Sequence, residues 1–272
     1  MFVEDIPIPH VGSKRVLVRT HYSAVSLGTE LRTIRFARAS LIKKAMERPD
    51  LVKQVLEVTK KSGVLEALTK VREKISMPFP LGYSVAGEVI AVGENVKDFR
   101  VGDRVACAGA EYAYHAEVVS VPENMCVKVP SNVDLQEAAF VAMGAIAIHG
   151  VRNVGVSFGE TAAVIGLGLL GQISVQLLRA GGCHVFGTDI VKEKVQRALD
   201  NGAVDGCSFQ QESLEDSIRA FAPEGVDAVL IMATTQSNQP LQVAANATRE
   251  RGCIVVAGRG SPWWCYRLLL RE

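Results

Sequence analysis

The sequence lacks paired cysteines, an excess of either charge and a secretion signal. Its six cysteines are scattered without a CxxC pair, which argues against both a disulfide framework and a structural zinc knot. The formal net charge is +1, so nothing points to nucleic acid or to an anionic membrane surface. The start, MFVEDIPIPH, has neither the basic segment nor the apolar stretch of a signal peptide. We therefore expect a cytoplasmic protein with reduced thiols.

What is present is a chain of 272 residues, 48% hydrophobic and 22% charged, enough for one large domain or two ordinary ones. Residues 161–189 (TAAVIGLGLLGQISVQLLRAGGCHVFGTD) organise the rest. Their pattern predicts a strand over 162–165, a glycine turn over 166–171, a helix over 169–180 and a second strand over 184–188. Polar residues interrupt the apolar run well short of the ~20 residues that a membrane span needs. The stretch is typical of a βαβ unit.

Each part of this unit has a chemical role in binding a dinucleotide. Gly166 allows the tight turn, Gly168 leaves room for a pyrophosphate, and Gly171 lets the helix pack close to the strand. The free N–H groups at the helix N-terminus attract the phosphates. Asp189 lies 18 residues beyond Gly171, near the position of the carboxylate that binds a ribose 2′-hydroxyl. That acid favours NAD over NADP, while the nearby Lys194 keeps NADP open.

The residue patterns before and after this unit differ. Residues 1–35 and 78–130 carry short strand patterns that suggest a small β-barrel, with His21–Glu30 as a polar loop. Between them, residues 40–75 have apolar residues at helical spacing. After Asp189 strands and helices alternate, which implies a parallel sheet covered on both faces. In that part, 240–251 is expected to be a helix and 253–257 the fifth strand, and 259–272 fits no pattern.

The chain resembles the medium-chain dehydrogenase/reductase (MDR) superfamily, which joins a GroES-like barrel to a Rossmann domain. The resemblance rests on 82–89 (GYSVAGEV), 101–105 (VGDRV) and 166–171 (GLGLLG). The sequences of residues 21–30, 40–75, 81–84 and 145–150 are similar to those of the bi-domain oxidoreductase subgroup. The resemblance implies an α/β fold with a GroES-like domain at 1–140, carrying a helical insertion at 40–75, and a Rossmann dinucleotide-binding domain at 141–272. Against that pattern both ends look truncated, and the Rossmann sheet incomplete at its C-terminus.

The positions that match the zinc ligands of this superfamily depart from it. They hold Leu27, Tyr83 with Ser84, and Met143; leucine cannot bind zinc, and tyrosine and methionine bind it poorly. The resemblance therefore predicts a zinc-independent enzyme.

Without zinc, another group must serve the reacting oxygen. The hydroxyls of Thr29 and Tyr83 are the catalytic candidates, with a turn hydroxyl and a barrel-core ring as the structural alternatives. His115 and His149 are more often structural than catalytic.

The function expected is a zinc-independent, NAD-dependent oxidoreductase acting on a small alcohol or carbonyl compound. The alternatives are a dinucleotide-binding module without catalysis and an NADPH-dependent quinone- or enoyl-type reductase. Relatives imply a homodimer through the dinucleotide domain, although the strand that usually mediates it is not evident. The expected cofactor contacts are Gly166, Leu167, Gly168, Leu169, Leu170, Gly171, Asp189, Ile190, Lys194, Ala233, Thr234 and Gly258.

Overall fold

The computed structural model describes residues 3–38, 79–209, 214–235 and 237–257. The chain forms two compact units, Met1–Ala139 and Phe140–Glu272, which we describe one at a time. The predicted helical insertion at 40–75, the expected cofactor contact Gly258 and the segment 259–272 lie outside the described residues.

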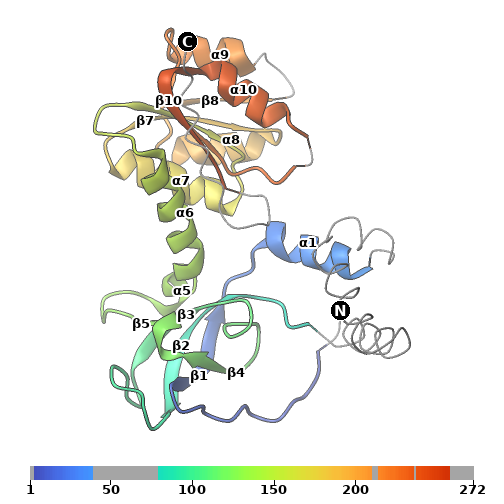
Figure 1. Ribbon diagram of the computed structural model, residues 1–272, viewed down its shortest axis with the longest axis vertical. Coiled ribbons are helices and arrows are strands. Elements are labelled where there is room, and N and C mark those ends of the chain that lie inside the picture. The colour runs from blue at the N-terminus through green and yellow to red at the C-terminus, as the bar shows by residue number, and fades with distance from the viewer. Residues whose placement is uncertain (1–2, 39–78, 210–213, 236, 258–272) are drawn as a thin grey trace, which may run out of the picture. The chain divides into compact units, whose positions relative to one another are not determined.

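The first unit is built on a five-stranded antiparallel sheet in the order β4-β1-β2-β3-β5 (Figure 1). Alternating valines of the strands, such as Val16, Val18, Val85 and Val89, form its buried core. The elements are β1 (Arg15–Ser23), α1 (Leu27–Arg38), β2 (Ser84–Val92), β3 (Arg104–Ala108), β4 (Val118–Pro122), the 3-10 turn η1 (Glu123–Met125), β5 (Cys126–Lys128) and α5 (Leu135–Ala138).

One expectation for this unit was wrong. His21–Glu30 is not a loop, because β1 continues to Ser23 through pairing with β2 and α1 begins at Leu27. The helix starts there because Ser26 and Glu30 bond reciprocally. The Glu30 N–H donates to the Ser26 carbonyl at 2.9 Å, and the Ser26 N–H donates to Glu30 Oε1 at 3.0 Å. A polar, glycine-bearing sequence therefore hides a well-capped helix start.

The second unit is a parallel sheet in the order β10-β9-β6-β7-β8. Its elements are α6 (Val141–Val154), β6 (Thr161–Ile165), α7 (Leu169–Ala180), β7 (His184–Asp189), α8 (Lys192–Asp200), β8 (Asp205–Ser208), α9 (Leu214–Phe221), β9 (Val226–Ile231), α10 (Gln239–Ala247) and β10 (Thr248–Val256). The chain runs outward from β6 in both directions, so the strand order reverses between β6 and β9. Ligands of such sheets bind beyond the carboxyl ends of the strands at that reversal.

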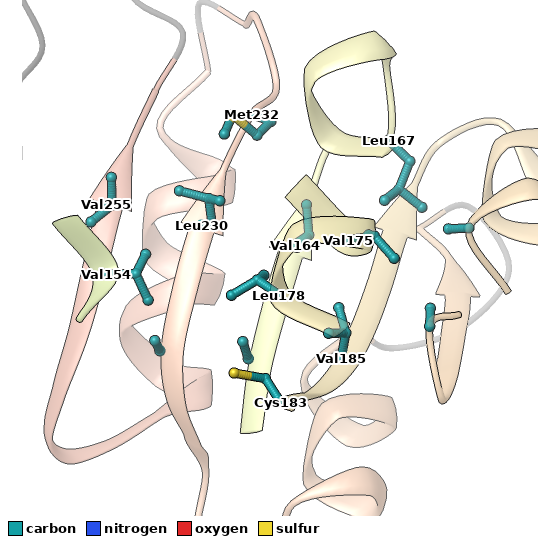
Figure 2. Close-up of a cluster of buried hydrophobic side chains, with 14 of the residues drawn as sticks. Val154, Val164, Leu167, Val175, Leu178, Cys183, Val185, Leu230, Met232 and Val255 are labelled. Carbon is teal, nitrogen blue, oxygen red and sulfur yellow. The ribbon is translucent and has the colours of Figure 1, made fainter. Parts of the chain in front are cut away.

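Helices cover both faces of this sheet. Successive residues of β6 point to opposite sides, with Val164 in one cluster and Ile165 in the other. The first cluster contains side chains of α6, α7 and α8, and Figure 2 shows Val154, Val175 and Leu178 among them. The second contains side chains of α9 and α10. The prediction of a doubly wound α/β fold is confirmed.

The expected helix over 240–251 was too long. Helix α10 ends at Ala247 and strand β10 begins at Thr248. The Thr248 hydroxyl donates to the Ala244 carbonyl at 2.5 Å, and Thr248 pairs with Val226 of β9 before the register shifts. The β-branched residue and this pairing end the helix four residues early.

A carboxylate, Asp227, ties together the amino ends of three neighbouring strands. Its Oδ2 accepts from the N–H and the hydroxyl of Thr161, both at 2.7 Å, and Arg249 Nε donates to its Oδ1 at 2.6 Å. Burial alone would raise the pKa of Asp227, but the hydrogen bonds from Thr161 and Arg249 outweigh it and hold that pKa below its usual value. The carboxylate is therefore stabilised in its charged form in the folded chain.

We expect Asp227→Asn to lower the free energy of unfolding by about 1.5–3 kcal/mol near neutral pH, the range for hydrogen bonds to charged groups. A carboxyl whose pKa is depressed by folding stabilises above its unfolded pKa of about 3.9, and that contribution is lost as the pH falls. The difference between wild type and variant should therefore shrink on going from about pH 7 to about pH 3 in urea unfolding. Glu224→Gln, at an exposed carboxylate in the turn before β9, is the control. A difference independent of pH would contradict this account.

Candidate functional site

The glycine turn begins where β6 ends. Gly166 has φ +96°, and a Cβ there would lie 2.5 Å from the Ala233 backbone nitrogen, just beyond β9. Its N–H donates to the Thr188 carbonyl at 2.8 Å. The position needs glycine for both its backbone angle and its contact. The turn is thereby held between β7 and the end of β9, at the reversal of strand order.

The other two glycines open helix α7. Gly168 is its N-cap, with no side-chain cap, and a Cβ added there would meet nothing within 4 Å. At Gly171 a Cβ would lie 2.0 Å from the Gly166 carbonyl oxygen. The first glycine keeps the space in front of the helix open, while the second allows the helix to approach the turn. The close approach at Gly171 is the packing that was expected, while a pyrophosphate in the open space at Gly168 stays a prediction.

Asp189 ends β7 beside this turn, and its side chain is only 8% exposed. Its Oδ2 accepts from the Leu167 N–H at 2.8 Å, and its Oδ1 accepts from the Val191 N–H at 3.0 Å. Lys194 Nζ lies 3.4 Å from Oδ1. The acid thus supports the glycine turn, a structural role that the sequence did not indicate. Its charge is partly balanced by Lys194.

Sequence reasoning missed Gln172. It is 8% exposed within α7, and its Nε2 donates to the Lys194 carbonyl at 2.8 Å and to the Leu167 carbonyl at 3.3 Å. It thus connects the glycine turn to the start of α8. The available signal was a polar residue, Gln172, directly after the last glycine of the turn and among the apolar residues that open α7.

The remaining cofactor candidates in the described part of this unit lie at the same end of the sheet. Leu167 is buried, Leu169 and Leu170 are half-buried in the first turn of α7, and Ala233 is half-buried after β9. Thr234 and Ile190 are exposed. The structure brings these residues to one edge, as the topology requires of the carboxyl ends of parallel strands.

The catalytic candidates belong to the first unit. Thr29 is exposed in the first turn of α1, where its Oγ1 accepts from the Ser26 hydroxyl at 3.4 Å. Tyr83 immediately precedes β2 and is half-buried. Its carbonyl accepts from the Gly109 N–H at 2.9 Å. Thr29 is therefore a helical residue rather than a turn hydroxyl.

His115 has partners that its sequence position did not reveal. Its Nδ1 lies 2.9 Å from Ser23 Oγ, and its Nε2 lies 3.3 Å from Glu30 Oε1 without hydrogen-bond geometry. Glu30 is 8% exposed. The histidine thus joins the end of β1 to α1 and has the structural role favoured by the sequence. His149 lies 3.0 Å from Asn153 Nδ2 on α6.

Within the described ranges, no three His, Cys, Asp or Glu side chains gather as a metal would require. No helix in that part of the chain is long and apolar enough to span a membrane.

Two family models match the chain. Residues 51–131 match the alcohol dehydrogenase GroES-like domain, and residues 170–263 match the zinc-binding dehydrogenase family. The chain belongs to the MDR superfamily. An oxidoreductase family with a GroES-like N-terminal domain and a Rossmann-like domain is therefore established.

Curated MDR proteins resemble the chain over part of their length. (R,R)-butanediol dehydrogenase of Bacillus subtilis is 30% identical over 47% of this chain and 44% of its own. Human sorbitol dehydrogenase is 26% identical over 69% of this chain and 60% of its own length. Human quinone oxidoreductase is 27% identical over 76% of this chain and 65% of its own length. The chain thus spans between 44% and 65% of the length of these relatives.

Solved MDR structures share the fold. Alcohol dehydrogenase TADH from Thermus sp. ATN1 has a TM-score of 0.74 at 21% identity, covering 95% of this chain and 75% of its own. Escherichia coli quinone oxidoreductase, solved with NADPH, has a TM-score of 0.70 at 19% identity, covering 95% and 71%. At such identities the likeness supports the fold alone.

Proposed function

We propose that this MDR chain is a zinc-independent, NAD(H)-dependent oxidoreductase of the bi-domain type. It would transfer hydride between the nicotinamide and a small alcohol or carbonyl compound. The observation that carries the cofactor choice is the Asp189 carboxylate, fixed against the glycine turn by the Leu167 N–H. A 2′-phosphate would meet this negative charge, whereas a ribose 2′-hydroxyl can donate to it.

The residues of the second unit fit a dinucleotide. The open N-terminus of α7 offers N–H groups to a pyrophosphate, and Gly168 leaves the backbone accessible. Asp189 would hold the adenosine ribose, with Ile190, Ala233 and Thr234 beside it on the same edge. The nicotinamide, when bound, supplies or accepts the hydride; the protein supplies position and proton handling.

The residues at the superfamily's zinc positions do not fit zinc. The Leu27 side chain is 68% exposed and offers no donor atom. Tyr83 offers a phenol and Met143 a thioether, neither of which is a usual zinc ligand. No step of the proposed reaction therefore passes through a metal.

A hydroxyl is proposed to serve the reacting oxygen instead. As hydride reaches a carbonyl carbon, the oxygen gains negative charge and then a proton. Thr29 is exposed and polarised by the Ser26 hydroxyl, so it is the first candidate to donate that hydrogen bond. Tyr83 is the second. In the oxidation direction the same group would accept the proton.

A second candidate function is an NADPH-dependent quinone-type reductase. It is favoured by Lys194, whose ammonium lies 3.4 Å from Asp189 and could bind a 2′-phosphate, and by the quinone oxidoreductases among the relatives. Calorimetric titration with NADH and with NADPH separates the two, since tighter NADPH binding favours the reductase. NADH binding without turnover over a panel of carbonyl compounds would instead indicate a binding module.

We expect Thr29→Val to lower kcat by about 10²-fold or more, because the isosteric side chain cannot donate a proton. The Kd for NADH should stay within about twofold, since Thr29 is not assigned to the cofactor. The matched control is Thr33→Val, one turn later in α1, whose hydroxyl donates to the Thr29 carbonyl at 3.0 Å. If Thr29→Val keeps full activity and Tyr83→Phe loses it, the role belongs to Tyr83.

A further inference from the structure

Two cysteines on neighbouring strands of the first unit face each other. Cys107 of β3 and Cys126 of β5 are register partners, and their sulfur atoms lie 3.5 Å apart. Nineteen positions separate them along the chain, so no short cysteine motif marks the pair. Neither cysteine belongs to the residues assigned to the oxidoreductase reaction.

The backbone at this pair is suited to a disulfide. The Val129 N–H donates to the Arg104 carbonyl at 2.9 Å, which makes these two residues a hydrogen-bonded pair of the antiparallel ladder. Hydrogen-bonded and non-hydrogen-bonded pairs alternate along such a ladder. Cys107 and Cys126 are three steps further and form a non-hydrogen-bonded pair, for which the Cα atoms lie about 4.5 Å apart. Disulfides span Cα separations of about 4.4–6.8 Å.

The two sulfurs differ in accessibility. Cys107 is fully buried among the valines of the sheet, whereas Cys126 is half-buried. The hydrogen bond with Cys126, and then burial, raise the pKa of the Cys107 thiol. Cys107 is therefore the less reactive thiol, and Cys126, in the more exposed residue of the two, is the one that a dissolved oxidant should meet first.

We propose that Cys107 and Cys126 form a site of oxidative modification, which hydrogen peroxide converts into a cross-strand disulfide. The Cys126 sulfur attacks the peroxide O–O bond, giving a sulfenic acid and one water. The Cys107 sulfur then displaces the sulfenic oxygen as a second water, and the S–S bond forms. Two thiols lose two electrons and two protons, peroxide is reduced to two waters, and exchange with an external dithiol reverses the change.

The disulfide would change how β5 is held. This strand has three residues, Cys126–Lys128, at the edge of the sheet next to β3. A covalent link at Cys126 fixes its first residue to the sheet and closes the chain from β3 through β4. Closing this loop restricts the unfolded chain, so the oxidised form should unfold at a higher temperature.

The test oxidises the purified chain with hydrogen peroxide, blocks the remaining thiols and maps peptides without reduction. We expect a peptide joining Cys107 to Cys126, a mass loss of about 2 Da for the two hydrogens, and recovery of both thiols with dithiothreitol. Native chain in which both thiols stay free, or in which Cys126 proceeds to sulfinic acid without a crosslink, would overturn the proposal.

Variants separate the two roles. Cys107→Ala should accumulate a sulfenic acid at Cys126 that dimedone traps, and Cys126→Ala should leave Cys107 reduced at the same peroxide dose. Cys183→Ala, at a buried thiol of the other unit, should keep the crosslink. If Cys107→Ala fails to fold, the crosslinked peptide of the native chain and the Cys126→Ala result still decide the question. None of these measurements depends on oxidoreductase activity.

Discussion

Asp189→Asn should reverse the cofactor preference. The amide keeps an oxygen for the Leu167 N–H, which Asp189 accepts at 2.8 Å in the wild type, but it removes the negative charge. Loss of a charged hydrogen bond to the ribose hydroxyl should weaken NADH by about 10- to 100-fold. NADPH should bind at least about 10-fold more tightly, because Lys194 would no longer be paired with a carboxylate.

Calorimetry with both nucleotides measures this change, and Lys194→Gln provides the control. Placed in the Asp189→Asn background, it should remove the gain in NADPH affinity without restoring NADH. Placed alone, it should weaken NADPH further and leave NADH nearly unchanged. Unchanged ratios in all three variants would mean that the 2′ position does not lie at Asp189.

Alanine at Gly168 and at Gly171 should separate binding from folding. Gly168 has extended backbone angles, φ −69° and ψ −168°, that any residue adopts, and no neighbour lies within 4 Å of an added Cβ. Gly168→Ala should therefore leave Tm unchanged. Its methyl group would nevertheless occupy the space through which a pyrophosphate approaches the α7 N–H groups, so NADH affinity should fall by about 100-fold or more.

Gly171→Ala should lose stability as well as NADH binding, for a different reason. Its Cβ would lie 2.0 Å from the Gly166 carbonyl oxygen, a backbone atom that cannot move without shifting the turn. We expect a loss of about 3 kcal/mol, the upper end of the usual cost of overpacking, together with loss of binding. Thermal unfolding and NADH titration of both variants check this contrast. Normal NADH affinity in Gly168→Ala would falsify the position proposed for the pyrophosphate.

The βαβ unit could be predicted because its signals are local. Gly166, Gly168 and Gly171 follow an apolar strand and open a helix, and the structure has α7 start at Leu169 as expected. Asp189 was found by its distance along the chain. The contact of Asp189 with the Leu167 N–H could not be predicted, because this contact depends on how β7 lies beside the turn.

Other features depend on contacts between distant residues. The end of α10 at Ala247 reflects pairing of Thr248 with Val226, which no helical pattern contains. The contact between Glu30 and His115 and the approach of Cys107 to Cys126 join residues that are far apart in the sequence. The start of α1 was local, but the Ser26 and Glu30 cap was hidden within a polar segment. Composition and periodicity describe segments, and these contacts belong to the packed sheet.

Asp227 and Asp189 lie at opposite ends of the strands of the parallel sheet. Asp227 bonds Thr161 and Arg249 where strands begin, and Asp189 supports the glycine turn where they end. Directed evolution can therefore use two separate libraries of variants, one for each end of the strands. Substitutions around Asp227 can be screened for heat resistance and those around Asp189 for nucleotide choice. Since parallel strands keep the two sets a full strand length apart, gains from both should combine nearly additively.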